Sequence, residues 1–197
     1  MAPEHEAFRE HARTRAPKRM RIDFAVQQEA LGTANALASA EKAVGEEPFL
    51  MLNGDNLYPH EALEAMTRVT GNAIAGFERM SLVENSNIPA ERIAAFALIR
   101  HSERHLTGMI EKPSEAERAK YGENAPVSMN LFAFEKAVFE ACRAIVPSAR
   151  GEYEIVDAVL ALADVQVVPV SGGVLDLSRR DDIADVERRL AHVSVRL

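Results

Sequence analysis

Apolar and polar positions alternate along the chain in blocks that predict strands and helices by turns. Residues 49–52 form a run of four apolar residues behind Pro48, which is typical of an interior parallel strand covered on both faces. Residues 33–44 are rich in alanine and favour a helix. Further strands are predicted at residues 22–27, 73–77, 127–134, 165–170 and 174–177, and further helices at residues 61–69, 135–145 and 155–163.

Local polar signals add a hairpin and two helix starts. Residues 93–99 and 106–111 are predicted to pair as strands across the polar turn at 101–104. Ser114, with Glu117 three positions on, predicts a capping box, and Ser178 is expected to cap a final helix. This alternation indicates an α/β sheet with mostly parallel strands and a small antiparallel part.

Composition fits one domain, expected to span residues 1–197. The chain is 47% hydrophobic, enough for one sizeable core, and its net charge of −7 argues against a nucleic-acid partner. Cys142 is the only cysteine and lies in an apolar helical pattern, so we expect it in the core. No apolar run approaches the roughly 18 residues of a membrane span, and the charged start resembles no signal peptide. We therefore expect a cytoplasmic protein that binds no membrane.

Two carboxylates follow apolar runs. Asp55 lies in the turn Asn-Gly-Asp-Asn after the strand at 49–52, and Asp176 ends the run at 173–177. Ligands of α/β sheets bind at the carboxyl ends of strands, and carboxylates there suit Mg²⁺ together with substrate phosphate. The alternatives are a solvated Asp55 that caps the next helix, or paired general acid and base carboxylates.

Two other segments also place residues that could bind a ligand at the end of a predicted strand or the start of a predicted helix. Gly32 lies at the entry to the helix at 33–44, where free amides favour phosphate, although a helix entry needs no ligand. Glu111 and Lys112 end a predicted strand before Pro113. They suit a polar, charged ligand, but an exposed ion pair would look the same.

Six segments in this order and spacing resemble the sugar nucleotidyltransferases, the nucleoside-diphosphate-sugar pyrophosphorylases that include glucose-1-phosphate thymidylyl- and uridylyltransferases. They are QQEALGTANAL, FLMLNGDN, GMIEKP, VSMNLFAF, ARGEYEIVDAV and GGVLDLSRRDDI, from about residue 22 onward. The resemblance implies a Rossmann-like sheet of the GT-A type. It also implies a reaction in which a sugar 1-phosphate attacks the α-phosphate of a nucleoside triphosphate and releases pyrophosphate.

The resemblance also implies residue roles. Asp55 and Asp176 would hold Mg²⁺, and Lys112 and Arg150 would bind phosphate. The positions implied to contact the base or the sugar are Gln27, Gly32, Glu111, Asn130, Glu152 and Glu154.

One family feature is missing from this sequence. Family members begin with a strand and a glycine-rich signature, roughly GxGTRxxPxTxxxPK, that cradles the triphosphate, and residues 14–18 echo it only superficially. Residues 1–20 look instead like the helix and loop after the family's second strand. We therefore expect an N-terminally truncated sheet without its first βαβ unit, on the order of 30 residues.

Such a loss would impair catalysis and expose an apolar sheet edge, which favours a homodimer. A non-catalytic regulatory or interaction subunit that keeps the sugar-phosphate pocket is the alternative function, and a truncated gene product is a third reading.

Overall fold

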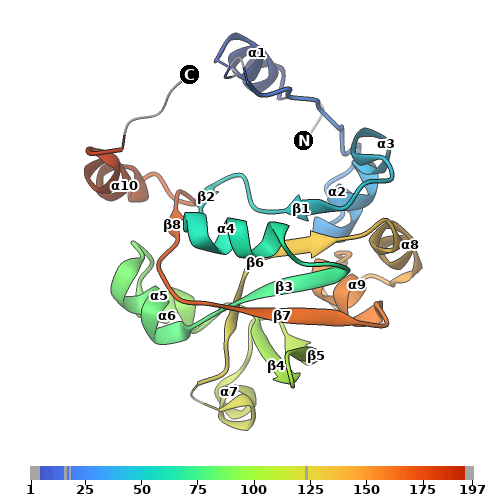
Figure 1. Cartoon of the computed structure of the whole chain (residues 1–197), viewed down its shortest axis with the longest axis vertical. Helices are drawn as coiled ribbons and strands as arrows, with labels where there is room; N and C mark the ends of the chain where they lie inside the picture. The colour runs from blue at the N-terminus through green and yellow to red at the C-terminus, as the bar shows by residue number, and fades with distance from the viewer. Residues whose placement is uncertain (1–4, 16, 18, 123, 194–197) are drawn as a thin grey trace. The chain divides into compact units, whose positions relative to one another are not determined.

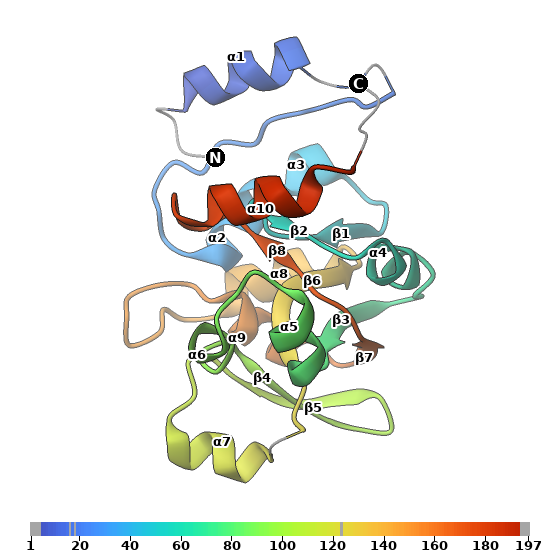
Figure 2. The same cartoon turned by 90° about the vertical axis from the view of Figure 1, so that its left-hand side faces the viewer.

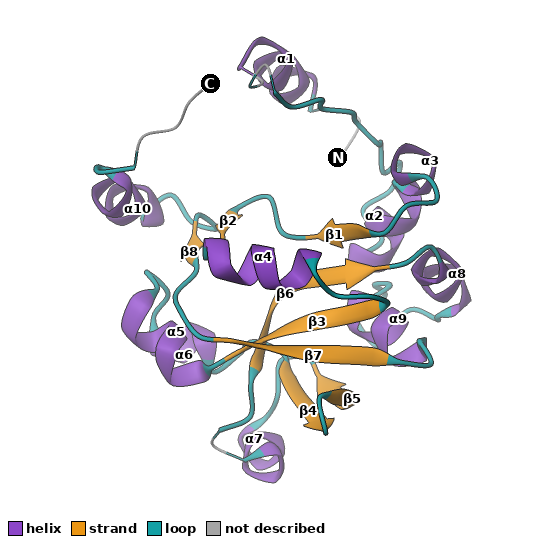
Figure 3. Cartoon of the chain, in the orientation of Figure 1, coloured by secondary structure: helices purple, strands orange, loops and turns teal. Residues whose placement is uncertain are grey.

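The computed structural model describes residues 5–15, 17, 19–122 and 124–193. These residues divide into two compact units. The first consists of Met1–Glu47, Lys136–Leu162 and His192–Leu197, and the second of Pro48–Glu135 and Ala163–Ala191. In the described ranges, the strands all belong to the second unit (Figure 3). The single domain and the homodimer both stay predictions.

The first unit is helical. Its helices are α1 (Glu6–Arg15), α2 (Thr33–Ser39), α3 (Glu41–Val44), α8 (Ala137–Ala144) and α9 (Ile155–Ala161). The helix predicted at 33–44 is divided at Ala40, which ends α2 and begins α3. Residues 22–27, predicted as a strand, form no regular element, so that prediction is wrong.

The buried side chains of α8 confirm its apolar pattern. Val138, Phe139, Ala141 and Cys142 are buried. Burial raises the pKa of the Cys142 thiol to about 11, which keeps it protonated and unreactive at neutral pH. Cys142 therefore belongs to the core, as predicted.

A mixed six-stranded sheet forms the centre of the second unit (Figure 1). Its order is β1 (Phe49–Met51), β6 (Val127–Phe134), β3 (Asn72–Phe77), β7 (Val165–Val170), β5 (His105–Ile110) and β4 (Leu98–Ser102). β3 and β7 pair in parallel, whereas the other described pairs in this sheet are antiparallel. These pairings give β1, β3, β4 and β7 one direction and β5 and β6 the opposite one. Most of the strands therefore point in one direction, although most neighbouring pairs are antiparallel. The predicted α/β class with a mostly parallel, partly antiparallel sheet is confirmed by these strand directions.

Helices and a second small sheet surround these strands. The helices are α4 (His60–Thr67), α5 (Arg79–Asn85), α6 (Ala90–Ile93), α7 (Glu115–Tyr121) and α10 (Asp182–Leu190). β2 (Asn56–Leu57) and β8 (Leu175–Asp176) pair antiparallel as a separate two-stranded sheet. The segment that leads from β7 to β8 passes beside α5 (Figures 1 and 2).

β1 differs from its prediction. It lies at the end of the strand order, pairs antiparallel with β6, and its residues are only half-buried. Leu52, the last residue of the apolar run, is 44% exposed. An apolar run alone does not say whether a strand is covered on both faces, and here it is not.

The predicted hairpin is confirmed, with one change. β4 and β5 pair across Glu103 and Arg104, whose φ values of 49° and 69° suit a tight two-residue turn. The first strand was predicted to begin at residue 93, but Ile93 is the last residue of α6 and β4 begins only at Leu98. The capping box of Ser114 and Glu117 is present at the start of α7, which packs beside β4.

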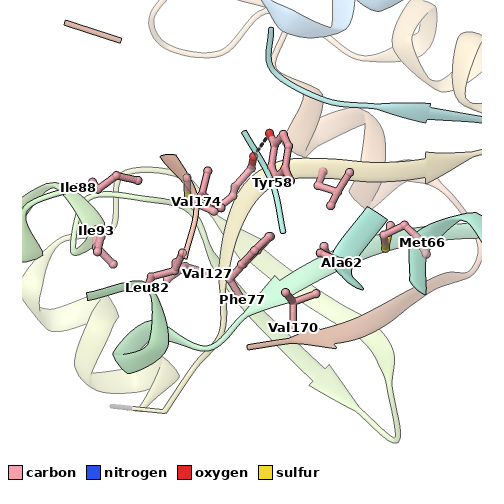
Figure 4. Close-up of a cluster of buried hydrophobic side chains, with 14 of the residues drawn as sticks. Tyr58, Ala62, Met66, Phe77, Leu82, Ile88, Ile93, Val127, Val170 and Val174 are labelled. Atoms are coloured by element: carbon pink, nitrogen blue, oxygen red, sulfur yellow. Dashed lines mark hydrogen bonds between the residues drawn. The ribbon is translucent and has the colours of Figure 1, made fainter. Parts of the chain in front are cut away.

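The core of the second unit gathers around β3 and β6. Phe77 is fully buried, and its ring lies 6.4 Å from that of Tyr58 (Figure 4). Leu82, Val127 and Val170 are buried in the same cluster. This cluster joins α5 to the sheet, and so supports the segment that carries β8.

Phe77→Ala is expected to lower the free energy of unfolding by about 3–5 kcal/mol, because it removes a buried ring and leaves a cavity. Met80→Ala is the control, since Met80 is 59% exposed, and its effect should stay within about 0.5 kcal/mol. Urea denaturation curves give both values. Equal midpoints for the two variants would contradict the placement of Phe77.

Candidate active site

Asp55 lies in an exposed loop between β1 and β2. Its backbone carbonyl accepts a hydrogen bond from the amide of Leu177 at 2.9 Å. Next to it, Asn56 faces Asp176 in the β2–β8 pair. Asp176 therefore lies on β8, and Asp55 lies in the loop just before the partner strand β2, so the small sheet rather than the main one brings the two residues near each other.

Asp176 is buried, with 5% of its surface exposed. Its Oδ1 accepts hydrogen bonds from Arg92 Nη2 at 2.9 Å and from the Ser178 amide at 2.9 Å. Its Oδ2 accepts one from Asn56 Nδ2 at 3.2 Å. A buried carboxylate needs such partners, because it has lost its hydration.

Ser178 joins the two carboxylates. Its hydroxyl donates to Asp55 Oδ2 at 3.3 Å, while its amide donates to Asp176. The prediction that Ser178 caps the final helix is wrong, since Asp181 is the N-cap of α10. Because one residue bonds to both carboxylates, Asp55 and Asp176 are both direct neighbours of Ser178.

The partners of Asp176 also set its ionisation. Burial by itself disfavours the charged form, but the hydrogen bonds from Ser178 and the ion pair with Arg92 outweigh it and lower the pKa of Asp176. Asp176 is therefore a carboxylate at neutral pH.

Side chains from α5 and the α5–α6 loop hold the backbone that leads to Asp176. Ser81 Oγ accepts from the Gly172 amide at 2.7 Å, and Ser86 Oγ accepts from the Val174 amide at 3.0 Å. Asn87 both accepts from the amide of Asp176 and donates to its carbonyl, each at 2.8 Å.

Gly173 lies in the close contact between the segment before β8 and the end of α5. A Cβ on this residue would lie 2.2 Å from the carbonyl oxygen of Asn85, which is backbone and cannot move aside. The segment before β8 therefore lies directly on the end of α5, and the position of Asp176 follows from that contact.

Tyr58 anchors the Asp55 loop to the main sheet. Its hydroxyl donates to the carbonyl of Met129 at 2.6 Å, the hydrogen bond drawn as a dashed line in Figure 4. The same hydroxyl accepts from the amide of Asn53 at 3.3 Å. Burial raises the pKa of Tyr58 to about 12, and the charges of Asp55 and Asp176 act in the same direction. The hydroxyl therefore keeps its proton and its hydrogen bond to β6.

Asn130 lies in a bulge of β6. The register between β3 and β6 shifts between Ile74 and Gly76, which leaves residues 129–131 as the bulge. Asn130 has a φ of 56°, and its amide donates to Ser128 Oγ at 3.2 Å. A left-handed residue inside a strand is unusual and is a reason to look for function there.

Glu111 and Lys112 follow β5 directly, where the sequence predicted a strand end. Both are exposed, and Lys112 has a φ of 48°. Ile110, the last residue of β5, pairs with Leu98, which also pairs with Val127 at the start of β6. Glu111 and Lys112 thus leave the sheet one strand away from β6, the strand that carries Asn130, with β4 between them.

Gln27 and Gly32 lie together in the first unit. Gln27 Nε2 donates to the Gly32 carbonyl at 3.1 Å and to Asn35 Oδ1 at 2.9 Å. Gly32 has a φ of 107°, and a Cβ there would lie 2.6 Å from the Tyr153 carbonyl oxygen. The tight packing against Tyr153 is a structural reason for this glycine, independent of any ligand.

Arg150 and Glu154 form an ion pair in the first unit. Arg150 Nη2 lies 2.5 Å from Glu154 Oε1, which also accepts from Ser148 Oγ at 3.1 Å. Glu152 is exposed, and its carbonyl accepts from the Ser148 amide at 2.9 Å. The predicted phosphate and sugar residues of this segment are therefore neighbours in one short loop.

The donor set of Asp55 and Asp176 fits a magnesium ion. Oδ1 of Asp176 is occupied by two donors, but Oδ2 accepts one hydrogen bond, and Asp55 is exposed with one weak bond from Ser178. Mg²⁺ is commonly held by one or two carboxylates together with water and substrate phosphates. In the part of the chain that the structure describes, no three His, Cys, Asp or Glu side chains gather for a metal, so phosphate and water would complete the shell.

A sequence model of the nucleotidyl transferase family matches residues 1–172. This chain belongs to that family. The match begins before residue 22, where the resemblance was expected to begin, and it ends before Asp176. The predicted likeness to sugar nucleotidyltransferases is confirmed by the relatives as well.

Two of the following three curated relatives are named for glucose 1-phosphate. A UTP–glucose-1-phosphate uridylyltransferase of Haloferax volcanii is 31% identical over 175 residues, covering 86% of this chain and 67% of that protein. A glucose-1-phosphate thymidylyltransferase of Streptomyces antibioticus is 27% identical over 171 residues, covering 85% and 45%. The bifunctional protein GlmU of Methanococcus vannielii is 30% identical over 146 residues, covering 73% and 32%. The chain thus spans from about a third to two thirds of these relatives.

Solved structures share the fold. A Bacillus anthracis protein assigned as a glucose-1-phosphate thymidylyltransferase, in complex with a sucrose, gives a TM-score of 0.71 at 19% identity, covering 98% of this chain and 75% of that one. A UDP-glucose pyrophosphorylase complexed with UDP-glucose gives 0.67 at 18% identity, covering 87% and 66%. In the described residues, no helix is both long and apolar enough to cross a membrane.

Asp176→Asn should change how stability depends on pH. Because the pKa of Asp176 is lowered by folding, its charge stabilises the fold above the unfolded-chain pKa of about 3.9, and this contribution is lost as the pH falls through the folded-state pKa. The difference in unfolding free energy between wild type and Asp176→Asn should therefore shrink from neutral pH to about pH 3.

Urea denaturation across that range measures the difference. Glu84→Gln, an exposed carboxylate on α5, is the control and should give a small difference at every pH. A pH-independent difference for Asp176→Asn would show that its carboxylate is not stabilised as described.

Proposed function

We propose that this chain carries the acceptor and metal site of a sugar-1-phosphate nucleotidyltransferase. The substrates are a nucleoside triphosphate and a sugar 1-phosphate, and the products are a nucleoside diphosphate sugar and pyrophosphate. The observation that carries the proposal is the pair of carboxylates, Asp55 and Asp176, joined through Ser178 in a chain of this family. In the reaction, a phosphate oxygen of the sugar 1-phosphate bonds to the α-phosphorus, and the bond from that phosphorus to the bridging oxygen of pyrophosphate breaks.

Asp55 and Asp176 are proposed to hold Mg²⁺. When bound, the ion would neutralise phosphate charge. Asp176 suits this role because it stays ionised, and Asp55 suits it because its loop is fixed by Tyr58 and by the Leu177 amide. Hydrogen bonds thus hold the backbone on both sides of the proposed site.

The β5 end and the β6 bulge are proposed to bind the sugar phosphate. Lys112 would contact the phosphate, since an ammonium group offers three donors and a full charge. Glu111 would accept hydrogen bonds from sugar hydroxyls, and the backbone at Asn130 would contact the sugar. The left-handed backbone at Lys112 and Asn130 supports these assignments, because such strain gathers at ligand sites.

The residues of the first unit are assigned by resemblance. Gln27 and Gly32 would contact the nucleotide base, and Glu152 or Glu154 would face the sugar. Arg150 would bind phosphate through its planar, bidentate guanidinium. Its ion pair with Glu154 keeps the guanidinium ordered, and a phosphate would compete with that carboxylate.

Turnover by the 197-residue polypeptide should be weak. Its sequence contains no glycine-rich signature to hold the triphosphate in line. Loss of even one donor to a developing charge typically lowers a rate by about 10²–10³-fold. The second proposed function is a regulatory or interaction subunit that binds sugar phosphate without turnover.

A pyrophosphate-release assay tests the proposal, using the pure chain, Mg²⁺ and a panel of nucleoside triphosphates and sugar 1-phosphates. We expect release far below the ordinary enzyme median of about 10 s⁻¹, and its loss in Asp55→Ala. Full turnover that Asp55→Ala abolishes would show that another segment holds the triphosphate. Activity unaffected by Asp55→Ala would contradict the metal site.

Lys112→Ala should weaken sugar 1-phosphate binding by about 1.5–3 kcal/mol, because a hydrogen bond to a charged group is lost. Titration calorimetry of the chain with glucose 1-phosphate measures the change. Lys120→Ala on α7 removes an exposed lysine of the same unit and should leave the affinity unchanged. Equal affinities of Lys112→Ala and wild type would show that Lys112 is an exposed residue with no part in binding the sugar phosphate.

A further inference from the structure

Arg92 is the one charged partner of Asp176 among the described residues, and no local pattern in the sequence identifies it. It lies on α6, and its side chain is only 18% exposed. Nη2 lies 2.9 Å from Asp176 Oδ1, and Nη1 lies 3.6 Å from Asp182 Oδ2. The two carboxylate side chains are 7% and 12% exposed, so these three charges interact with little water between them.

The guanidinium is not fully satisfied by its surroundings. Its Nη1 is buried and has no hydrogen-bond partner in the described part of the chain. Arginine stays charged at any ordinary pH, so Arg92 is a permanent counter-ion for Asp176. An arginine with only a structural role would be expected to have hydrogen-bond partners for both of its terminal nitrogens.

The same carboxylate is a proposed metal ligand. A cation on Asp176 Oδ2 would share one carboxylate with the guanidinium on Oδ1, and the two positive charges would repel each other at short range and low solvation. The free protein therefore offers a divalent cation a carboxylate that is already neutralised. Phosphate oxygens would offset this repulsion, because they add negative charge and further ligands on the open side near Asp55.

We propose that Arg92 competes with the divalent cation for Asp176, so that the cation binds weakly to the free protein and tightly only together with a polyphosphate. This inference rests on the proposed function, since it assumes the Asp55–Asp176 metal site. It adds a residue that makes metal binding depend on the substrate. Arg92 acts through Asp176 and is a positioning residue.

Mn²⁺ is the probe, titrated into the full chain and followed by electron paramagnetic resonance and calorimetry. Arg92→Gln should tighten Mn²⁺ binding at least about tenfold without nucleotide, because a nearby positive charge is removed. Arg68→Gln, which breaks an exposed ion pair on α4, is the matched control and should bind like wild type. Adding tripolyphosphate should tighten binding to wild type more than binding to Arg92→Gln.

Thermal unfolding gives a second measurement. Arg92→Gln leaves Asp176 without its counter-ion, so its melting temperature should fall, and Mn²⁺ should restore it by more than it raises that of wild type. If Arg92→Gln does not fold, Asp182→Asn is the variant that tests the inference. It removes the second carboxylate from the guanidinium, which then favours Asp176 more strongly, so Mn²⁺ should bind more weakly than to wild type.

The outcomes separate this inference from the proposed function. If wild type binds Mn²⁺, Asp176→Asn does not, and a folded Arg92→Gln binds no more tightly than wild type, the inference is wrong and the metal site stands. If Arg92→Gln does not fold, the inference is wrong when Asp182→Asn binds Mn²⁺ as tightly as wild type or more tightly. If neither wild type nor Arg92→Gln binds Mn²⁺, even with tripolyphosphate, both the metal site and the inference fail.

Discussion

The buried carboxylate of Asp176 is the constraint on which the arrangement around it depends. A carboxylate out of water must be paired and hydrogen-bonded, or it would take up a proton. Arg92 supplies the charge, and Ser178 and Asn56 supply further donors. Meeting that need fixes β8 against β2 and brings the Asp55 loop within hydrogen-bond distance of Ser178. Electrostatic satisfaction of one group thus positions the second carboxylate as well.

Tyr58 extends the same arrangement to the main sheet. A bulge in a strand leaves backbone groups without ladder partners, and buried ones must be satisfied elsewhere. The Met129 carbonyl of the bulge is satisfied by the Tyr58 hydroxyl, which also holds the Asn53 amide before Asp55. The proposed metal ligand and the proposed sugar contact at Asn130 are therefore connected through one buried phenol. A substitution in the Asp55 loop should therefore alter the bulge at Asn130, and a substitution in the bulge should alter the loop.

Local signals in the sequence were enough for several elements. The β4–β5 hairpin and the capping box at Ser114 depend on residues a few positions apart, and both are present. The covering of β1 depends on distant strands, and its prediction was wrong. Asp55 and Asp176 could be singled out because each follows an apolar run. Arg92 and Tyr58 were missed because their partners are 84 and 71 positions away, and no spacing rule connects them.

The left-handed backbones at Lys112 and Asn130 are the least expected features from sequence, and they bear most directly on function. A non-glycine residue in this region costs roughly 1–2 kcal/mol, so the surrounding structure must impose it. At Lys112 the following residue, Pro113, is buried and favours an extended preceding backbone, so it does not account for the φ of 48°. At Asn130 the bulge and the Ser128 hydroxyl hold the turn. Both residues lie where the sugar phosphate is proposed to bind, whereas the other described residues of this kind, Glu103 and Arg104, form the hairpin turn. Strain that a hairpin turn explains needs no ligand, whereas strain inside a strand and at a strand end supports the proposal that the sugar phosphate binds there.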